Sequence, residues 1–283
     1  MTTDAQEPHH LPTFVIRPVT GRGRTSLREL HGYGDLLFLL VRRDITVRYR
    51  QTILGVAWAV LQPVLLMVVF TVFLGNLAGI KSATSVPYPV FTFAGLVPWT
   101  LFSSAVSAAS GSLTGNANLI SRVFFPRLVL PMASVGGSLV DAGIALVVLA
   151  AMMAGYGIVP GWPVVLVPLF LALAVVAAFG VGILLAALNV TYRDVRYGVP
   201  YLMQVWLLVS PVAYPATKVP AHLQWLYGLN PMAGVVEGFR WALTGGPAPA
   251  PALIAASTIS SVLLLVAGSS YFHRAERRFA DVI

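Results

Sequence analysis

A run of 26 residues at 164–189, VVLVPLFLALAVVAAFGVGILLAALN, contains no Asp, Glu, Lys or Arg. A helix needs roughly 20 mostly apolar residues to cross a bilayer, so this run is long enough to span one. The whole chain of 283 residues shares this character, because 57% of its residues are apolar and only 10% are charged. Soluble domains average about 25% charged residues. The composition therefore indicates an integral membrane protein and excludes both a soluble domain and a disordered chain.

Charge-free intervals and helix-breaking residues divide the chain into six such stretches. The longest interval, between Asp141 and Arg193, must contain a turn, and the Gly- and Pro-rich segment 155–163 supplies it. Prolines and glycines also interrupt 218–250, where we predict short interfacial or re-entrant helices. The predicted fold is an all-α integral membrane protein with six transmembrane helices near 54–79, 89–113, 128–154, 164–189, 199–217 and 252–272.

Lys and Arg gather on one side of these predicted helices. Of the 18 basic residues, eight precede the first helix, two lie in 114–127, two in 190–198, and three follow the last helix. Cytoplasmic loops carry such an excess, so we predict a multi-pass protein with both termini in the cytoplasm. The net charge of +8 then reflects topology and contact with anionic membrane lipids, and it does not predict nucleic-acid binding. The predicted parts are a flexible cytoplasmic tail (1–26), an interfacial helix and loop (27–53), the six-helix domain (54–275) and a cytoplasmic C-terminal tail (276–283).

Residues 27–50 mix apolar and charged positions in a pattern typical of a helix that lies along a membrane surface. One interpretation is that its arginines anchor the helix to any anionic headgroup. Another is that they bind the phosphates of a lipid-linked substrate, because guanidinium groups match phosphate oxygens in geometry. Both interpretations apply to the same four residues, Arg42, Arg43, Arg48 and Arg50.

The loop 114–127 contains a helix-like run that ends at Pro126 and places Phe124 and Phe125 beside two arginines. These rings either anchor in the lipid headgroups or dock on a cytoplasmic partner. The residues alone leave both possibilities open.

Polar residues within the predicted helices are few. Asp141 is the one acid inside a span, and a charge at that depth is costly without a partner. We therefore predict a structural role, either a hydrogen bond to a neighbouring helix or a cap beside 136–138. The second span carries a polar run that suits close packing or a polar path, namely Ser103, Ser104, Ser107, Ser110 and Gly111.

Motifs for catalysis, metal binding and nucleotide binding are missing from the sequence. There is no Cys, and the nearest approach to a P-loop, 79–82, lacks the required Gly-Lys pair. We therefore expect no cofactor, no metal and no ATP hydrolysis on this chain.

Six ordered blocks of sequence resemble one family. They are Arg43–Trp58 with Gln62-Pro63, Gly95–Trp99, Asn118–Arg127 with Pro131, Asn189–Arg196, Ser210–Tyr214, and Asn230–Met232 with Arg240. Over about 30–275 the chain is similar to the membrane subunits of bacterial ABC exporters for lipid-linked polysaccharides, such as O antigen, teichoic acid, capsule and galactan.

This resemblance implies a homodimer in the bacterial cytoplasmic (inner) membrane that binds two cytoplasmic ABC ATPase subunits, with ATP and Mg on those partners. The implied substrate is a glycan linked to a polyprenyl diphosphate. The helix at 36–50 would be a gate whose arginines contact the diphosphate, and the short helices in 218–247 would cap the external mouth. A coupling helix for the ATPase would contain Asn118, Arg122, Phe124, Phe125 and Arg127. Rings along the conduit would correspond to Trp58, Phe91, Trp99, Phe102, Trp206 and Tyr214.

Other functions fit the sequence less well. An ABC permease for drugs or small lipids is the main alternative. A secondary transporter or channel is disfavoured because one intramembrane acid gives little means of coupling to an ion gradient. An integral membrane glycosyltransferase would need clustered carboxylates, whereas Asp35, Asp44 and Asp194 are far apart in sequence.

Overall fold

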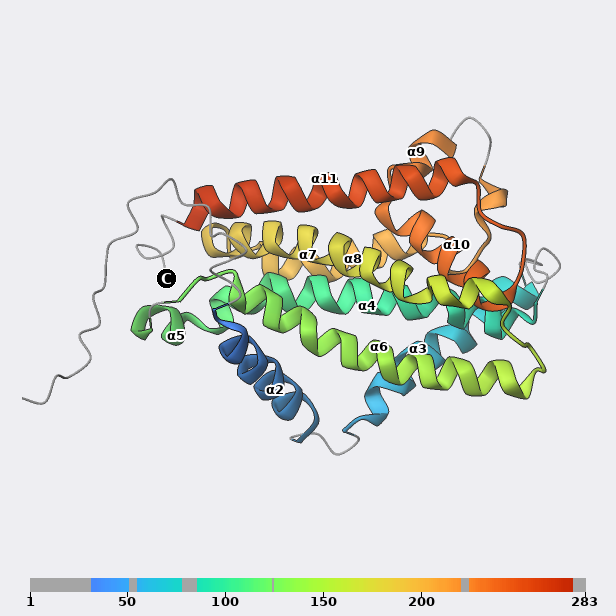
Figure 1. Ribbon diagram of the computed structural model, residues 1–283, viewed down its shortest axis with the longest axis horizontal. Helices are drawn as coiled ribbons and strands as arrows, with labels where there is room; N and C mark the ends of the chain where they lie inside the picture. Colours follow the sequence, from blue (N-terminus) through green and yellow to red (C-terminus); the bar gives the residue numbers. More distant parts are fainter. Residues whose placement is uncertain (1–31, 51–54, 78–85, 124, 220–223, 277–283) are drawn as a thin grey trace, which may run out of the picture.

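The computed structural model describes residues 32–50, 55–77, 86–123, 125–219 and 224–276. Every regular element in this part of the chain is a helix, which confirms the all-α prediction (Figure 1). The predicted N-terminal tail, Phe124 and all but the first residue of the predicted C-terminal tail lie outside the described residues.

Five helices in the described residues are long and apolar enough to cross a membrane, and each agrees with a predicted span to within three residues at either end. They are Ala57–Asn76 (α3, Ala57–Phe70, with the π-helical turn η1, Thr71–Leu77), Tyr88–Gly115 (α4), Val129–Gly155 (α6), Trp162–Thr191 (the 3-10 turn η3, Trp162–Leu166, with α7, Val167–Thr191) and Pro251–Ala275 (α11).

The structure of the remaining segment, predicted as a span over 199–217, differs from the prediction. The helix α8, Val195–Val209, has only 15 residues and is about 22 Å long, whereas a bilayer core is about 30 Å thick. It ends because Ser210, which precedes Pro211, takes an extended conformation. A proline disfavours helical geometry in the residue before it. The chain then continues through a buried, non-helical segment, 210–213.

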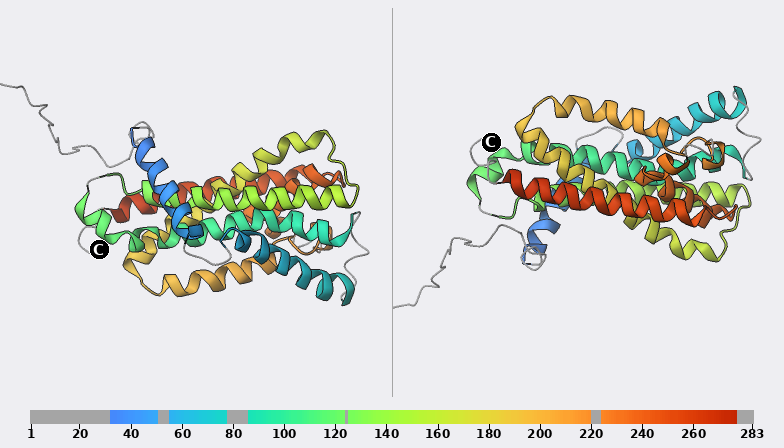
Figure 2. Two further views of the ribbon diagram at one scale, coloured as in Figure 1. Left: turned by 90° about the horizontal axis from the view of Figure 1, so that it is seen from below. Right: turned by 90° about the horizontal axis from the view of Figure 1, so that it is seen from above.

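Helices of the bundle surround α4, which is the most deeply buried of the spans, while α3 is the most exposed. Helices α6 and α7 pack against α4, and α11 packs against α7. In both views of Figure 2, α3 and α8 lie on the same side of the bundle.

Two short helices mark the opposite ends of the bundle. Helix α5, Ala117–Arg122, lies at one end together with α2, Gly34–Arg50, and we call this the α5 end (Figure 1). Helix α9, Gln224–Gly228, lies at the other, which we call the α9 end, near the 3-10 turn η4, Ala216–Lys218.

Helix α10, Pro231–Thr244, is largely buried among α4, α7 and α11 at the α9 end. The Asn230 side chain caps its first turn by accepting a hydrogen bond from the Met232 amide at 3.0 Å. Gly245 ends it with φ of 66°, a left-handed conformation that favours glycine. Two short helices, α9 and α10, thus lie within 218–250; α10 is an interior helix, and the predicted interfacial or re-entrant character of this segment stays a prediction.

Candidate functional site

Small hydroxyl-bearing residues form a stripe along α4 that is less buried than the rest of this helix. Most of this helix is buried, and Thr100, Ser103, Ser104 and Ser107 are its less buried positions near mid-length. They line a pocket of about 360 Å³ that lies among α3, α4, α6 and α8. The other residues that line this serine pocket are Ala59, Gln62, Pro63, Asp141 and Met203. Of the polar run predicted in the second span, Ser103, Ser104 and Ser107 line this cavity, whereas Ser110 and Gly111 do not.

The hydroxyls of this stripe donate to their own helix. Ser107 Oγ donates to the Ser103 carbonyl at 2.7 Å, and Thr100 Oγ1 donates to the Val97 carbonyl at 3.1 Å. Ser104 Oγ likewise donates to the Leu101 carbonyl at 3.3 Å. Each proton is used within the helix, so the oxygens can still accept hydrogen bonds from a molecule in the pocket. The serine pocket is therefore rich in hydrogen-bond acceptors.

Asp141, which lines one side of the serine pocket, links α6 to α2. Its carboxylate accepts hydrogen bonds from Arg48 Nη1 and from the Tyr49 hydroxyl. Burial and the neighbouring carboxylate raise the pKa of Tyr49 to about 12, so this hydroxyl keeps its proton. The partner on a neighbouring helix that the sequence predicted for Asp141 is thus Arg48, with Tyr49 as a second donor.

Apolar contacts hold the same two helices together. Leu40 is the buried residue of α2, and Val41 faces α6 at Gly136. A Cβ at Gly136 would lie 2.8 Å from a methyl of Val41, so glycine is needed for this close approach. The 136–138 segment therefore serves helix packing, and α6 continues through it without a break.

The four arginines of α2 have different surroundings. Arg48 is paired with Asp141, and Arg43 bonds to Asp44 and to Asn116 Oδ1, each at 2.9 Å. Asn116 lies between α4 and α5. Arg42 and Arg50 are exposed, and their guanidinium groups have no hydrogen bond or ion pair among the described residues.

Helix α5 exposes part of the segment predicted to contact a partner. Asn118 and Arg122 are exposed at the α5 end. Phe125, in contrast, is buried in an apolar cluster with residues of α4, α6 and α7, so its ring faces the interior of the bundle, and its part in ATPase coupling stays a prediction. Arg127 Nη1 donates to the backbone carbonyl of Glu276, which connects this loop to the end of α11.

The predicted conduit rings fall into two groups. Trp99 and Phe102 are buried in the core of the bundle, whereas Phe91, although only 5% exposed, lines a cavity at the α9 end. The sequence could not foresee this because α4 is apolar on all but one narrow stripe. Trp58, by contrast, is 51% exposed on α3.

Trp206 and Tyr214 are partly buried beside the end of α8. The Trp206 ring meets Phe102 edge-on, with centroids 5.1 Å apart, and its Nε1 donates to Asn230 Oδ1 at 3.0 Å. Tyr214 donates to the Leu208 carbonyl at 3.0 Å. Both rings therefore hold the chain where α8 stops.

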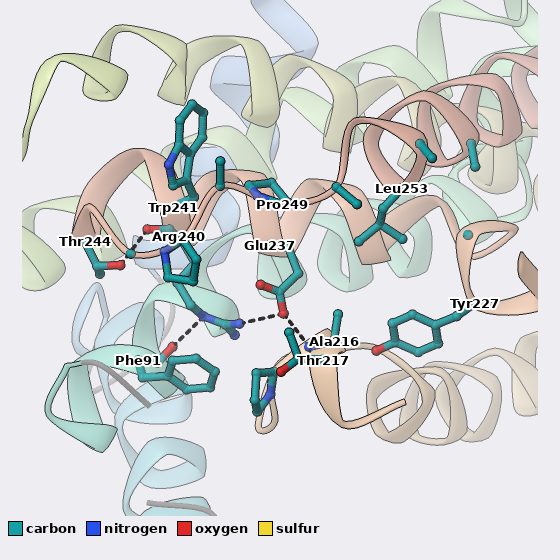
Figure 3. Close-up of a pocket in the computed structure, with 18 of the residues that line it drawn as sticks. Phe91, Ala216, Thr217, Tyr227, Glu237, Arg240, Trp241, Thr244, Pro249 and Leu253 are labelled. Atoms are coloured by element: carbon teal, nitrogen blue, oxygen red, sulfur yellow. Dashed lines mark hydrogen bonds and ion pairs between the residues drawn. The ribbon is translucent and has the colours of Figure 1, made fainter. Parts of the chain in front are cut away.

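Arg240 is the centre of the α9 end and was missed as a structural residue, since the sequence places it among the loop charges. It is 4% exposed. Its Nη2 donates to the carbonyls of Pro211 and Val212 at 2.7 and 2.9 Å. Its Nε donates to the Phe91 carbonyl at 3.2 Å (Figure 3). Non-helical backbone at membrane depth is tolerated where protein groups satisfy it, and Arg240 does this for the segment after α8. A signal was available in the sequence, because Glu237 lies three residues before Arg240 in an otherwise apolar helix.

Comparison with known proteins agrees with this architecture. The relative RfbA of Myxococcus xanthus, an O-antigen export system permease protein, is 32% identical over 260 residues, which cover 91% of this chain and 98% of that protein. An O-antigen export system permease protein RfbA from Klebsiella pneumoniae is 28% identical over 88% of this chain and 95% of its own length. The polysialic acid transport protein KpsM of Escherichia coli is 26% identical over 75% and 81%. The ABC-2 type transporter family matches residues 35–244. The chain is therefore a member of the ABC-2 type transporter family and a transport permease of the membrane.

Proposed function

We propose that this chain is the membrane subunit of an ATP-driven exporter that moves polyprenyl diphosphate-linked polysaccharide across the bacterial cytoplasmic membrane. The observation that carries the proposal is the serine pocket. It offers hydroxyl acceptors on α4 in a bundle that is otherwise apolar. Sugar hydroxyls are donors that such oxygens can accept without binding any one sugar tightly.

The position of the pocket supports a path that two copies share. It lies between α3 and α8, whose outer faces expose Trp58, Leu65, Tyr201 and Val205. A second copy packed against these faces would close the open side of the pocket and remove apolar surface from lipid. In this homodimer α8 and the buried segment after it make the sixth crossing together, which places both termini in the cytoplasm.

The α5 end supports contact with a separate ATPase. Helix α5 presents polar and basic side chains outward, and Asn116 at its start is bonded to Arg43 of α2. Movement of α5 would therefore be transmitted to α2, which is linked through Asp141 to the serine pocket. Two ATPase subunits, which bind ATP and Mg, would supply that movement.

The surroundings of the α2 arginines favour a substrate with phosphate at the entrance. Arg42 and Arg50 are exposed, and their guanidinium groups suit a diphosphate. Arg48 is already paired with Asp141, so the residues that line the serine pocket offer the diphosphate no unpaired cation. Sugars would thus pass through the pocket while the carrier head stays at α2. A permease for drugs or small lipids is the alternative, but it would gain little from a pocket of acceptors.

The test measures polysaccharide export in cells in which the gene for this protein has been deleted and replaced by a variant gene. We expect Ser103→Leu with Ser107→Leu to reduce surface polysaccharide at least tenfold, because apolar side chains fill the serine pocket, while basal ATPase activity of the purified complex remains. The matched control is Ser270→Leu, at an exposed position on α11. Normal export by the double variant would contradict the proposal. Export that fails in the control as well would indicate loss of folding.

A further inference from the structure

A second cavity lies at the α9 end. Its volume is about 570 Å³, within the range of small-molecule sites. Residues of α10, the first turns of α11, and the segments around Ala216 and Tyr227 surround it (Figure 3). This mouth pocket lies at the end of the bundle opposite α5, and so on the external side if α5 contacts a cytoplasmic ATPase.

The mouth pocket contains an arginine but offers little positive charge to a ligand. Four hydrogen bonds from Arg240, to Phe91, Glu237, Pro211 and Val212, use four of the five guanidinium N–H groups. The guanidinium also lies over the Phe91 ring, 3.6 Å from its centroid. A phosphate would have to compete with all these partners, so the pocket is unsuited to an anionic head.

Two polar atoms of the mouth pocket, on Glu237 and Tyr227, can accept hydrogen bonds from a ligand. Glu237 Oε1 accepts from Arg240 Nη1 at 3.2 Å and from the Ala216 amide at 2.8 Å, while no hydrogen bond within the described residues reaches Oε2. The Tyr227 hydroxyl donates to Tyr214 at 3.4 Å, which leaves its own lone pairs for a ligand. Burial raises the pKa of Tyr227, so it remains a neutral phenol.

The remaining walls are apolar and rigid. The loop 246–250 contributes two prolines, and Trp241 and Leu253 add apolar surface. A hydrocarbon chain would fit these walls but would cover the carboxylate oxygen without bonding to it. A ligand that covers this oxygen without donating to it removes the oxygen from water at a cost in free energy, so the favoured ligand brings hydroxyl donors together with apolar C–H faces. Sugars have both features.

We propose that the mouth pocket binds neutral sugar residues of the exported chain, with Glu237 Oε2 and the Tyr227 oxygen accepting from their hydroxyls. This inference rests on the proposed function, since it takes glycan as the substrate. Binding at this end would hold an emerging chain and oppose its return into the serine pocket.

The experiment measures binding to the full complex with its ATPase in lipid nanodiscs. The probe is the producing cell's own polysaccharide, released from its carrier by mild acid and labelled with a fluorophore at the reducing end, so that it carries no diphosphate. Fluorescence anisotropy gives Kd. We expect Glu237→Gln to raise Kd about tenfold. The substitution replaces a charged acceptor oxygen with an amide, whose NH₂ group donates where the sugar hydroxyl needs an acceptor. Tyr227→Phe, which leaves the Arg240–Glu237 pair intact, should raise it about threefold. The control Glu276→Gln, on the α5 side, should not change it.

Equal Kd values for all four proteins would overturn the inference. So would broadening of a fluorine label on Trp241 by spin-labelled phospholipid in the nanodisc, since that result makes a lipid the occupant. The proposed function is tested by a separate result. If export continues while Kd is insensitive to Glu237, only the mouth pocket is refuted. If the serine-pocket variant exports normally, the conduit is refuted whatever Kd shows.

Discussion

Removal of the Asp141 carboxylate should weaken the attachment of α2 to α6, and the free energy lost can be estimated from its two contacts. The Arg48 and Asp141 side chains are 37% and 24% exposed, so their ion pair is partly screened. Fully exposed pairs contribute about 0.2–1 kcal/mol, and hydrogen bonds to charged groups about 1.5–3. Because the Asp141 carboxylate is partly exposed, we place the Tyr49 hydrogen bond below this range and take about 1 kcal/mol for each of the two contacts.

These values predict a graded response in two substitutions at one position. Asp141→Asn keeps an acceptor for Tyr49 and loses the ion pair, so local opening of α2 should become about fivefold more frequent. Asp141→Leu loses both contacts, and opening should increase about 30-fold. Hydrogen exchange of peptides from 34–50 in nanodiscs measures this opening directly.

The control is Asp44→Asn. Asp44 pairs with the adjacent Arg43 at 2.9 Å within α2, so its loss removes charge from the same helix without cutting a bond to α6. Its exchange should remain within about twofold of the parent, as expected for a surface pair. Exchange in both Asp141 variants equal to the parent would refute the reasoning. It would mean that Leu40 and Val41 alone hold α2 in place.

Three further substitutions test the packing. Gly136→Ala should lower the apparent Tm of the detergent-purified protein by several degrees, because its Cβ would lie 2.8 Å from a valine methyl of α2; Gly143→Ala on the same helix meets nothing within 4 Å and should not. Arg240→Lys should destabilise the protein by about 3 kcal/mol, since the buried ammonium cannot reach all the carbonyls that the guanidinium satisfies, and lower yield with easier proteolysis would report this. Phe125→Asp should reduce folded yield, whereas Ser121→Asp on exposed α5 should leave yield unchanged and weaken copurification with the ATPase. A reversal of this last pair would place Phe125 on the docking surface after all.

Charge-free length was sufficient to predict five spans because each is a continuous helix bounded by breakers or charges. It failed at α8 because the helix there ends at Val209, and a buried non-helical segment follows it. Pro211 interrupts the helix, and the carbonyls after it bond to Arg240, which is 28 and 29 residues further along. A charge count reads Arg240 as a loop residue. No local pattern can indicate that its donors return to an earlier break in the chain.

The rings of α4 illustrate a second limit. In a helix that is apolar on nearly every side, composition does not distinguish a ring that packs inward from one that lines a path. The hydroxyl residues do carry this information, since Thr100, Ser103, Ser104 and Ser107 recur at spacings of three and four and mark one face. The polar stripe was thus a better guide to the pocket than the aromatic residues.

The arginines of α2 show what pairing adds to a sequence pattern. All four are equivalent candidates for phosphate contact in the sequence, yet Arg43 and Arg48 already have partners on other helices. A phosphate that recruited Arg48 would have to replace Asp141, and would free α2 from α6 in doing so. Arg42 and Arg50 can bind without that cost, and their spacing of eight residues, about two turns, places them on roughly the same side of α2. Initial capture should therefore depend on Arg42 and Arg50, while Arg48 decides whether the bound head loosens the helix.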